Sequence, residues 1–523
     1  MTEQILITYN ITCPYTDSIE QISQDIAHEQ TVELPASCIH DGFIKSQVVG
    51  QVNDIKQLSD QVYEVKIAYH PDVTGYEIPQ FLNLLYGNIS IKRNIKLVDI
   101  ELPSSVYRMF PGPSYGIDGI RKLTGIYERP LASTALKPMG TGPSAFAGIA
   151  ADFAAGGGDI IKDDHGIASQ RYCTFEERVK LVQRAVNKVN EQTGRNTLYF
   201  PNILCSAENL TRQIEYAISH GIKGILVSPF LLGLDQVRMI RTRYNLIIMG
   251  HPAFSGTHFQ DQTHGMTPAL LLGTIFRLIG CDISIYPNTG GRFSFSDKEC
   301  QDLNNALQGP LNNIKPAFPA PAGGMYLERI PEMAKVYGKD IVYLIGGALL
   351  KERDELRQGT EVFLDKIREQ FPELVRLPEQ MISSCELPSS SSQEILNFIK
   401  YNNNFQWEGR AVQVYKDSVS KDFKDISRIE LTGKNGENTK FDLRYFQIEP
   451  GGFSSFERHL HEHVVICIRG KGVIINGDEK YILSPHDIAY VKPNQPHQLR
   501  NEFDESFGFF CIVDHERDKP VNV

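Results

Sequence analysis

The chain has 523 residues, of which 41% are hydrophobic and 22% charged, and its formal net charge is −10. This composition is typical of globular domains with buried cores, and the length leaves room for roughly three of them. The acidic balance argues against nucleic acid and anionic membrane surfaces as partners, because both attract basic proteins.

Cysteine usage and the N-terminal segment predict a cytoplasmic protein. Nine cysteines are scattered without a CxxC pair, which favours reduced thiols over a disulfide framework. The N-terminal segment MTEQILITYNIT alternates like a strand and lacks the basic and apolar regions of a signal peptide. The longest apolar runs, such as residues 270–276, are far shorter than a membrane span.

Residues 1–118 mix strand-like alternation with helical stretches. The strand patterns lie at Ile5–Thr12, Val62–Tyr69 and Ile89–Asp99, and a helical pattern lies at Ser18–His28. We expect a small α+β domain of the ferredoxin-like type here.

Residues 119–372 alternate short apolar strands with amphipathic segments. Eight strands, each followed by a helix, are the number that closes a parallel (β/α)8 TIM barrel, so we expect an α/β barrel. The expected strands are Ser133–Lys137, Asp159–Asp164, Leu198–Ile203, Ile222–Ser228, Leu246–His251, Asp282–Tyr286, Lys315–Pro319 and Asp340–Ile345.

The C-terminal part of the chain has a different texture. Prolines and a serine run in residues 373–399 predict an exposed linker. Residues 400–523 are rich in short alternating strands separated by Gly, Pro and Asn turns, which predicts a compact all-β domain.

The second barrel strand ends in GGGDIIKDDHG, which places four polar residues at the edge where barrel enzymes hold their active sites. Lys162 and Asp164 would point the same way along a strand, with His165 next to them. A lysine beside carboxylates could react with CO2, and the carbamate would bind Mg2+ together with Asp164. The alternative is an exposed charged loop.

Other strand ends add candidate groups. Lys137 follows the first strand in ALKPMG, and His251 follows the fifth in GHPAF. Glycine pairs follow strands six to eight, where backbone N–H groups could approach a phosphate closely. The candidate substrate- or phosphate-binding residues are Asn288, Gly290, Gly291, Arg292, Gly323, Gly324, Gly346 and Gly347.

The order and spacing of these motifs resemble the RuBisCO large-subunit superfamily over residues 1 to about 370. The motifs are LKP of strand one, GGxDxxKDD of strand two and the glycine pairs of strands six to eight. The resemblance implies that Lys162 is carbamylated and that Asp164 is a Mg2+ ligand. It also implies that Lys137 is a general acid/base and that His251 lies near the substrate.

Several departures argue against carboxylation. His165 stands where the family has a third, glutamate metal ligand, and Met139 replaces a second lysine of strand one. The strand-six histidine and the mobile lysine of the following loop are also missing. Enolisation of a sugar phosphate needs only a metal and a base, so the chain resembles a non-carboxylating RuBisCO-like protein.

Two N-terminal residues bear on the oligomeric state and on which branch of the RuBisCO-like proteins the chain resembles. Glu29 and Asn88 match family residues that complete the active site of a neighbouring subunit, which implies a homodimer or a higher oligomer. The methionine-salvage enolases carry lysine where this chain has Asn88. KDDHG, GHPA and PNxGGRF are more similar to the branch that isomerises 5-methylthioribulose 1-phosphate.

The all-β region contains a histidine-rich motif. Glu457, His459, His461 and His463 are spaced by two, which predicts one face of a strand, and His497 follows further on. The two motifs resemble those of cupins, with Glu and His exchanged between the outer ligand positions. The resemblance implies Glu457, His459, His463 and His497 as ligands of Mn2+, Fe2+, Ni2+ or Zn2+, and His461 as a substitute. The alternative is a degenerate cupin that only dimerises or binds a sugar.

The fusion suggests a bifunctional sulfur-salvage enzyme. The barrel would isomerise 5-methylthioribulose 1-phosphate to a 1-methylthio-ketopentose 5-phosphate, and the cupin would release methanethiol to leave 1-deoxyxylulose 5-phosphate. Two alternatives remain open: another RuBisCO-like isomerase or decarboxylase acting on a sugar acid or sugar phosphate, and a catalytic barrel with a sugar-sensing cupin.

Overall fold

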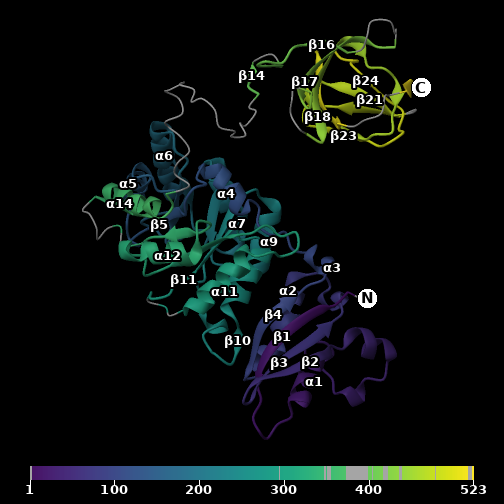
Figure 1. The fold of residues 1–523 in the computed structure, drawn as a ribbon. Coiled ribbons are helices and arrows are strands. Elements are labelled where there is room, and N and C mark those ends of the chain that lie inside the picture. The colour runs from purple at the N-terminus through teal and green to yellow at the C-terminus, as the bar shows by residue number, and fades with distance from the viewer. Residues whose placement is uncertain are drawn as a thin grey trace, which may run out of the picture. The chain divides into compact units, whose positions relative to one another are not determined.

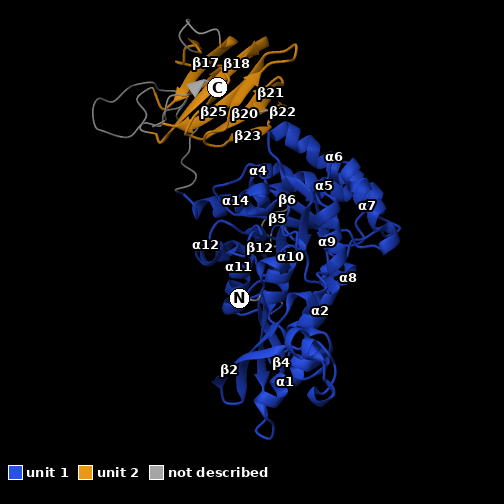
Figure 2. Cartoon of the chain, turned by 90° about the vertical axis from the view of Figure 1, so that its right-hand side faces the viewer, with its two compact units in different colours: residues 1–384 blue, residues 385–523 orange. Residues whose placement is uncertain are grey.

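The chain divides into two compact units, Met1–Ser384 and Cys385–Val523 (Figure 2). The computed structural model describes residues 3–291, 293, 295–346, 349, 355–372, 399–402, 405–415, 422–434, 439–476, 479–515 and 521–522. The expected phosphate-binding residues Arg292 and Gly347 lie outside the described residues, as does nearly all of the expected linker.

The N-terminal domain is a sheet with the strand order β10-β4-β1-β3-β2 (Figure 1). Its elements are β1 (Ile5–Thr12), α1 (Ile19–Glu29), β2 (Gln51–Ser59), β3 (Val62–Tyr69), α2 (Ile78–Tyr86) and β4 (Ile95–Glu101). These four strands pair antiparallel in the ferredoxin-like order, as expected. The strand β10 (Gly265–Met266) comes from the barrel region and pairs parallel with β4, which joins the two domains.

Eight parallel strands form the expected barrel, in the order β7-β6-β5-β13-β12-β11-β9-β8. The outermost strands of this order are joined by the parallel bridge between Asn202 and Leu226, so the barrel closes. The strands are β5 (Leu131–Leu136), β6 (Ile160–Asp163), β7 (Leu198–Phe200), β8 (Gly224–Val227), β9 (Ile247–Gly250), β11 (Ile283–Pro287), β12 (Phe318–Ala322) and β13 (Val342–Leu344).

Amphipathic helices follow the strands. In α6 (Phe175–Thr193), Thr174 caps the first turn by accepting a hydrogen bond from the Glu177 N–H, and Gly194 ends the helix in a left-handed conformation. The other helices of this region are α3 (Ser104–Tyr107), α4 (Gly116–Thr124), α5 (Pro143–Ala155), α7 (Ala207–Ser219), α8 (Pro229–Leu232), α9 (Leu234–Arg243), α10 (Phe276–Ile279), α11 (Asp297–Gln308), α12 (Ile330–Tyr337) and α14 (Leu356–Glu369).

The barrel interior is filled by side chains, which confines substrate binding to its ends. Ile160, Phe200, Ile247 and Phe318 belong to one buried cluster inside the ring of strands. A separate, larger cluster packs the helices on the outside of the barrel and continues into the N-terminal domain. Polar groups at the carboxyl ends of the strands therefore face the solvent-accessible mouth.

The seventh strand lies three residues later than expected. We expected Lys315–Pro319, whereas β12 spans Phe318–Ala322 and pairs in register with β11. Lys315 instead lies in the preceding loop, where its Nζ donates to the Ser114 carbonyl at 2.7 Å. The two prolines of FPAPA made this segment an unfavourable strand by sequence.

The C-terminal unit is an antiparallel β-barrel, as the all-β expectation required (Figure 1). Its interior packs Phe446, Ile448, Val465, Phe509 and Val513. The main strands are β17 (Lys424–Thr432), β18 (Phe441–Phe453), β20 (His463–Arg469), β21 (Gly472–Asn476), β22 (Glu479–Leu483), β23 (Ile488–Val491), β24 (His497–Arg500) and β25 (Phe507–Asp514). Shorter strands are β14 (Tyr401–Asn402), β15 (Gln406–Trp407), β16 (Gln413–Val414), β19 (Glu457–Arg458) and β26 (Val521–Asn522).

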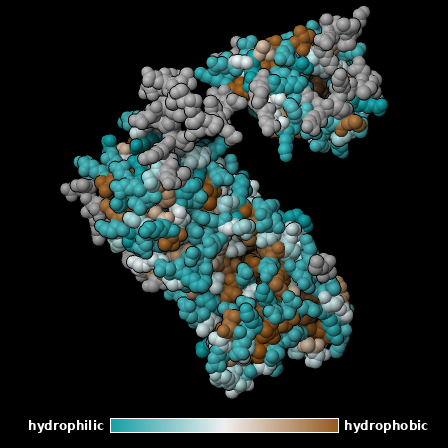
Figure 3. Space-filling view, viewed as in Figure 1, coloured by the Kyte–Doolittle hydropathy of each residue, from teal (hydrophilic) through white to brown (hydrophobic). Residues whose placement is uncertain are grey.

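The surface view shows apolar side chains gathered over the N-terminal domain (Figure 3). Exposed apolar residues of this domain include Leu34, Phe43, Leu58 and Ile91. Among the described residues, no helix combines the length and the apolar character that crossing a membrane requires.

Candidate functional site

The structure brings five predicted residues together at the mouth of the barrel, and we call them the barrel-mouth cluster. Lys162 lies in β6, Lys137 directly follows β5, and the other members follow β6 and β9. Lys137 Nζ is 3.5 Å from Asp164 Oδ1, and His165 Nδ1 is 3.6 Å from Asp164 Oδ2. The rings of His165 and His251 stack with centroids 4.5 Å apart. One carboxylate, two amines and two imidazoles thus share one small space.

Lys162 is the most deeply buried member of the cluster, with 2% of its surface exposed. Its Nζ donates to the Asp163 carbonyl at 3.1 Å. Burial lowers the pKa of Lys162 to about 8; Asp164 opposes this shift and Lys137 adds to it. Roughly a tenth of the amine is then neutral at pH 7, far more than for an ordinary lysine, and the neutral amine is the form that can add CO2.

Asp164 is the anionic centre of the cluster. Burial by itself would raise the pKa of Asp164, but a hydrogen bond with His165 and the charge of Lys137 hold it well below its usual range. A carboxylate, a carbamate on Lys162 and the His165 imidazole would make an O,O,N donor set. Carboxylate oxygens suit Mg2+, and an imidazole also suits softer divalent ions, so these residues fit a divalent metal.

His251 is held in one tautomer. Its Nδ1 accepts a hydrogen bond from the Ala253 N–H at 3.1 Å, so in the neutral ring the proton resides on Nε2. Burial, together with the charge of Lys162, lowers the pKa of His251 well below its ordinary value. A neutral imidazole with a fixed Nε2–H can donate a hydrogen bond to a substrate oxygen.

Asp163, the middle residue of the KDD motif, has a structural role. It faces away from the barrel mouth, is fully buried, and accepts from Arg178 Nε at 2.9 Å and from the Tyr199 hydroxyl at 2.8 Å. Its Oδ2 also accepts the Asn202 N–H at 2.9 Å. Asp163 therefore holds β6 to α6 and β7. Strand alternation predicted its direction, but nothing in the sequence identified Arg178 as its partner.

Two of the three predicted glycine pairs pack against one another. Gly290, Gly323 and Gly324 adopt left-handed φ angles of 68°, 90° and 64°. A Cβ at Gly324 would approach the Gly290 carbonyl oxygen to 3.2 Å, so side chains are poorly accommodated here. Gly291 lies against Gly323 in the same contact. Arg329, which the sequence reading missed, donates to the Thr289 carbonyl at 2.6 Å and holds the two loops together.

The remaining predicted phosphate-binding residues differ in placement. Asn288 is buried, and its Oδ1 accepts a hydrogen bond from the Tyr337 hydroxyl at 3.0 Å. This placement favours a role in anchoring the loop over direct contact with a ligand. Gly346 follows the eighth strand, and no atom of the described residues lies within 4 Å of the Cβ that a side chain would add there.

Glu29 and Asn88 meet on the surface of the N-terminal domain, joined by a residue the sequence reading missed. Asn88 Nδ2 donates to Glu29 Oε1 at 3.0 Å and to Glu33 Oε1 at 2.7 Å. Glu33 has a left-handed φ of 57°, a strained conformation for a residue with a side chain. In the described part of the chain, no hydrogen bond or ion pair links these three residues to the barrel-mouth cluster.

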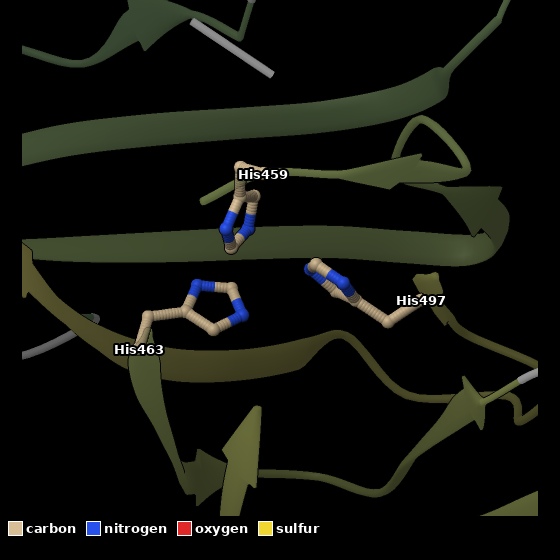
Figure 4. A group of neighbouring side chains, drawn as sticks. All are labelled: His459, His463 and His497. Carbon is tan, nitrogen blue, oxygen red and sulfur yellow. The ribbon is translucent and has the colours of Figure 1, made fainter. Parts of the chain in front are cut away.

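In the C-terminal unit, three histidines converge (Figure 4). His459, His463 and His497 are buried, and one ring nitrogen of each lies within 4.8 Å of those of the other two. We call these residues the histidine triad. Their rings point toward a common centre, as ligands of one metal ion would.

Each triad ring is engaged at Nδ1. His459 Nδ1 donates to the His461 carbonyl at 2.6 Å, and His497 Nδ1 donates to the Gln495 carbonyl at 2.9 Å. His463 Nδ1 lies 3.4 Å from Cys511 Sγ, and His463 Nε2 is buried with no hydrogen-bond partner among the described residues. Such outer contacts fix the tautomer of metal-binding histidines, so the Nε2 lone pairs are available to a metal.

Burial also keeps the triad neutral. It is the largest cause lowering the pKa of His459, His463 and His497, with the other histidines adding to the shift in each case. Only neutral imidazole ligates a metal. Three neutral nitrogen donors fit a first-row divalent ion such as Mn2+, Fe2+, Ni2+ or Zn2+.

The other two predicted ligands are near the triad but outside it. Glu457 lies in β19 opposite His497 in register, and His461 stacks on His459 with ring centroids 3.8 Å apart. The expectation that all four motif residues share one strand was wrong. Residues 459–462 form the connection between β19 and β20, where the Asn494 N–H donates to the His459 carbonyl at 2.7 Å.

The fold and these two sites define a RuBisCO-type barrel with its N-terminal domain, followed by a β-barrel of the cupin class. Residues 1–106 match the ribulose bisphosphate carboxylase large chain N-terminal domain, and residues 116–361 match the catalytic domain of that chain. Residues 444–513 match the cupin domain. The chain belongs to the RuBisCO large-chain family as a RuBisCO-like protein with a C-terminal cupin domain.

Several curated relatives are similar to more than half of this chain. The 5-methylthioribulose-1-phosphate isomerase of Rhodospirillum rubrum is 37% identical over 70% of this chain and 97% of its own length. A 2,3-diketo-5-methylthiopentyl-1-phosphate enolase of Geobacillus thermodenitrificans is 32% identical over 57% of this chain and 73% of its own.

Solved structures agree with this placement. A Rubisco-like protein from Rhodopseudomonas palustris superposes with a TM-score of 0.64 at 36% identity, covering 71% of this chain and 99% of its own. A dimeric archaeal Rubisco from Hyperthermus butylicus gives a TM-score of 0.66 at 26% identity, covering 71% of this chain and 91% of its own.

Proposed function

We propose that the barrel isomerises 5-methylthioribulose 1-phosphate to a 1-methylthio-ketopentose 5-phosphate, and that the cupin then releases methanethiol to leave 1-deoxyxylulose 5-phosphate. The observation that carries the first step is the barrel-mouth cluster, in a chain similar to the Rhodospirillum isomerase over 97% of that protein. The second step rests on the histidine triad.

The isomerisation needs only proton transfers. Moving the carbonyl from C2 to C4 of the five-carbon chain takes two successive enolisations, and in each a proton leaves one carbon and returns to its neighbour. Lys137 is the exposed amine of the cluster, with 45% of its side chain accessible, and is positioned to carry that proton. His251 would donate its Nε2–H to the substrate oxygen on which charge develops.

A divalent ion fits beside these groups. Asp164, His165 and carbamylated Lys162 would hold Mg2+, which supplies Lewis-acid polarisation of the substrate carbonyl when bound. Lys137 bridges to Asp164 at 3.5 Å, so the proton carrier and the ligand set are adjacent. Met139, in place of a second strand-one lysine, supports an enolising rather than a carboxylating site.

The cupin step is a reductive cleavage. Replacing the C–S bond by a C–H and an S–H bond consumes two electrons and two protons, so a thiol reductant must be supplied. The triad residues would hold Mn2+, Fe2+, Ni2+ or Zn2+, and such an ion supplies polarisation of the ketone beside the methylthio carbon. Glu457, across from His497, is the carboxylate nearest to this group in register.

Assembly would complete the barrel site. The Asn88–Glu29–Glu33 group is polar and surface-exposed, and exposed apolar residues Leu34 and Ile91 flank it in sequence. Contiguous exposed apolar surface marks interaction sites. We therefore propose a homodimer or a higher homo-oligomer in which this group reaches the barrel mouth of a second copy.

The decisive experiment incubates the full chain with 5-methylthioribulose 1-phosphate, Mg2+, bicarbonate and a thiol reductant in D2O. Wild type should incorporate deuterium into the sugar and release methanethiol. His459→Ala/His497→Ala should accumulate the 1-methylthio-ketopentose 5-phosphate and lose one transition metal per chain. Lys162→Ala should return the substrate unchanged, while the exposed-lysine control Lys298→Ala should behave as wild type.

The outcomes separate the proposed steps. Deuterium incorporation without methanethiol in the metal-loaded wild type would retain the isomerase and contradict the cleavage. Substrate returned unchanged by wild type would contradict the sulfur-salvage proposal altogether. A panel of other sugar phosphates and sugar acids would then be tested for the alternative RuBisCO-like isomerase or decarboxylase.

A further inference from the structure

Asn202 follows β7 and contacts the backbone of the turn that carries His165. It is fully buried and forms a bridge with Leu226, at the point where the barrel closes. Its backbone N–H donates to Asp163 Oδ2 at 2.9 Å. Any residue except proline could make this main-chain contact, so the contact does not explain why the side chain at position 202 is an amide.

The side chain of Asn202 holds the turn that follows β6. The turn is closed by the Ile167 N–H, which donates to the Asp164 carbonyl at 3.0 Å. Asn202 Nδ2 donates to the His165 carbonyl at 2.9 Å and to the Ile167 carbonyl at 3.0 Å. Both hydrogens of one amide group are therefore used on the backbone of a single turn, and that turn carries two members of the barrel-mouth cluster.

The amide of Asn202 is engaged on its donor side alone. Its Oδ1 is buried with no hydrogen-bond partner among the described residues. The reverse orientation of the amide would place Oδ1 against two carbonyl oxygens, so these acceptors fix the orientation. A buried acceptor without a partner costs free energy, and such costs are typical of residues that serve a functional site.

Asn190 shows how an asparagine beside the same strand serves stability. It lies near the other end of β7, where its Nδ2 donates to the Thr197 carbonyl at 2.9 Å and its Oδ1 accepts the Thr197 N–H at 3.0 Å. Both sides of this amide are satisfied by the backbone. The amide of Asn202 differs in that its donors are aimed at the residues of a candidate metal site.

The backbone contact matters because the side chain of His165 is only partly enclosed. Half of this side chain is exposed, its Nδ1 is 3.6 Å from Asp164 Oδ2, and its ring stacks on His251. The direction in which the imidazole leaves the chain is set by the backbone of the turn. The hydrogen bonds from Asn202 fix that backbone.

We propose that Asn202 is a positioning residue of the barrel metal site, which acts by holding the backbone from which the His165 imidazole reaches a divalent ion. The inference rests on the proposed function, in which His165 is one of the metal ligands. Removing a group that orients a metal ligand typically weakens metal binding by about 10- to 100-fold.

The test measures the affinity of the barrel for Mn2+ in the full chain, in bicarbonate buffer. A His459→Ala/His497→Ala background removes cupin ligands, so that the titration reports on the barrel. Free Mn2+ is followed by electron paramagnetic resonance. Asn202→Leu keeps the branched side-chain shape and the backbone N–H that reaches Asp163, but it has no donor for the turn.

Asn190→Leu is the matched control, because it also removes side-chain hydrogen bonds to the backbone beside β7. Both substitutions should lower the urea midpoint followed by far-UV circular dichroism. Only Asn202→Leu should weaken Mn2+ binding, by about 10- to 100-fold. Asn202→Asp, which has the same shape and also lacks the two donors, replaces Asn202→Leu if that variant does not fold.

A double-mutant cycle with His165→Ala separates positioning from a general loss of structure. If Asn202 acts through His165, Asn202→Leu should weaken Mn2+ binding little further once the imidazole is absent. The assignment would be overturned by a folded Asn202 variant that binds Mn2+ as tightly as its parent, by effects that simply add in the cycle, or by a parent whose barrel binds no Mn2+.

Deuterium exchange into 5-methylthioribulose 1-phosphate is measured separately on the same proteins. A parent protein that binds Mn2+ in the barrel but leaves this sugar unchanged would contradict the proposed function, and the cycle would still decide the role of Asn202.

Discussion

The two aspartates that follow Lys162 should differ in what an asparagine substitution removes: stability at Asp163 and catalytic activity at Asp164. Asp163→Asn removes the carboxylate that pairs with fully buried Arg178 and leaves that charge without a partner. Breaking a buried pair on one side typically costs about 3–5 kcal/mol. Asp164→Asn disturbs ion pairs whose members are 25–50% exposed, and it should change stability by no more than about 1 kcal/mol. Asp164→Asn should instead abolish isomerisation.

The chain offers separate probes for its two units. The only tryptophan, Trp407, lies in the C-terminal unit, whereas every helix in the described residues belongs to the first unit. Far-UV circular dichroism at the helix signal therefore follows the barrel, and tryptophan fluorescence follows the cupin, during urea unfolding. Asp163→Asn should lower the urea midpoint of the circular dichroism transition and leave the midpoint of the fluorescence transition unchanged. Equal shifts for Asp163→Asn and Asp164→Asn in the first transition would refute the structural assignment of Asp163.

Three further predictions follow from single residues. Carbamate formation on Lys162, measured by chemical trapping, should rise with pH around a midpoint near 8. Burial lowers the pKa of this amine, so roughly half of it is neutral at that pH. A midpoint above pH 10 would contradict this prediction. His463→Ala should lose the cupin metal, whereas His461→Ala, outside the triad, should retain most of it by elemental analysis. At Gly324 the φ angle is 64°, and an added Cβ would lie 3.1 Å from Arg329 Nη1. Gly324→Ala should therefore raise KM for phosphorylated substrates at least several-fold, with little change in the global unfolding midpoint.

The barrel was predictable because its signals are local. Buried parallel strands appear as short apolar runs, and all eight are present in the order expected, including β6 with Lys162 at its end. Because strand ends of a barrel converge, locating Lys137, Lys162 and His251 at strand exits was enough to predict that they meet. The one displaced strand, β12, carries prolines that mask its apolar pattern.

Contacts between distant segments were not predictable in the same way. Arg329 joins two glycine loops by donating to a backbone carbonyl, and Glu33 accepts a hydrogen bond from the Asn88 side chain. Neither contact leaves a spacing pattern in the sequence. In the cupin, the spacing of two suggested a continuous strand, whereas the chain turns at 459–462 to aim His459 and His463 at one point. The residue types marked these histidines as candidate ligands, but their convergence depends on that turn.

The two candidate metal sites differ in the donors that they offer, which bears on why one chain would carry both. The barrel offers oxygen donors inside a network of charges, with Lys137 and Asp164 in ion-pair contact, an arrangement suited to a hard ion and to moving protons. The cupin offers nitrogen donors whose Nδ1 atoms contact two backbone carbonyls and a thiol. The all-nitrogen triad suits a first-row transition ion better than the mixed oxygen and nitrogen set of the barrel does. Under the proposed function, each site would then act on a different bond of one sugar phosphate.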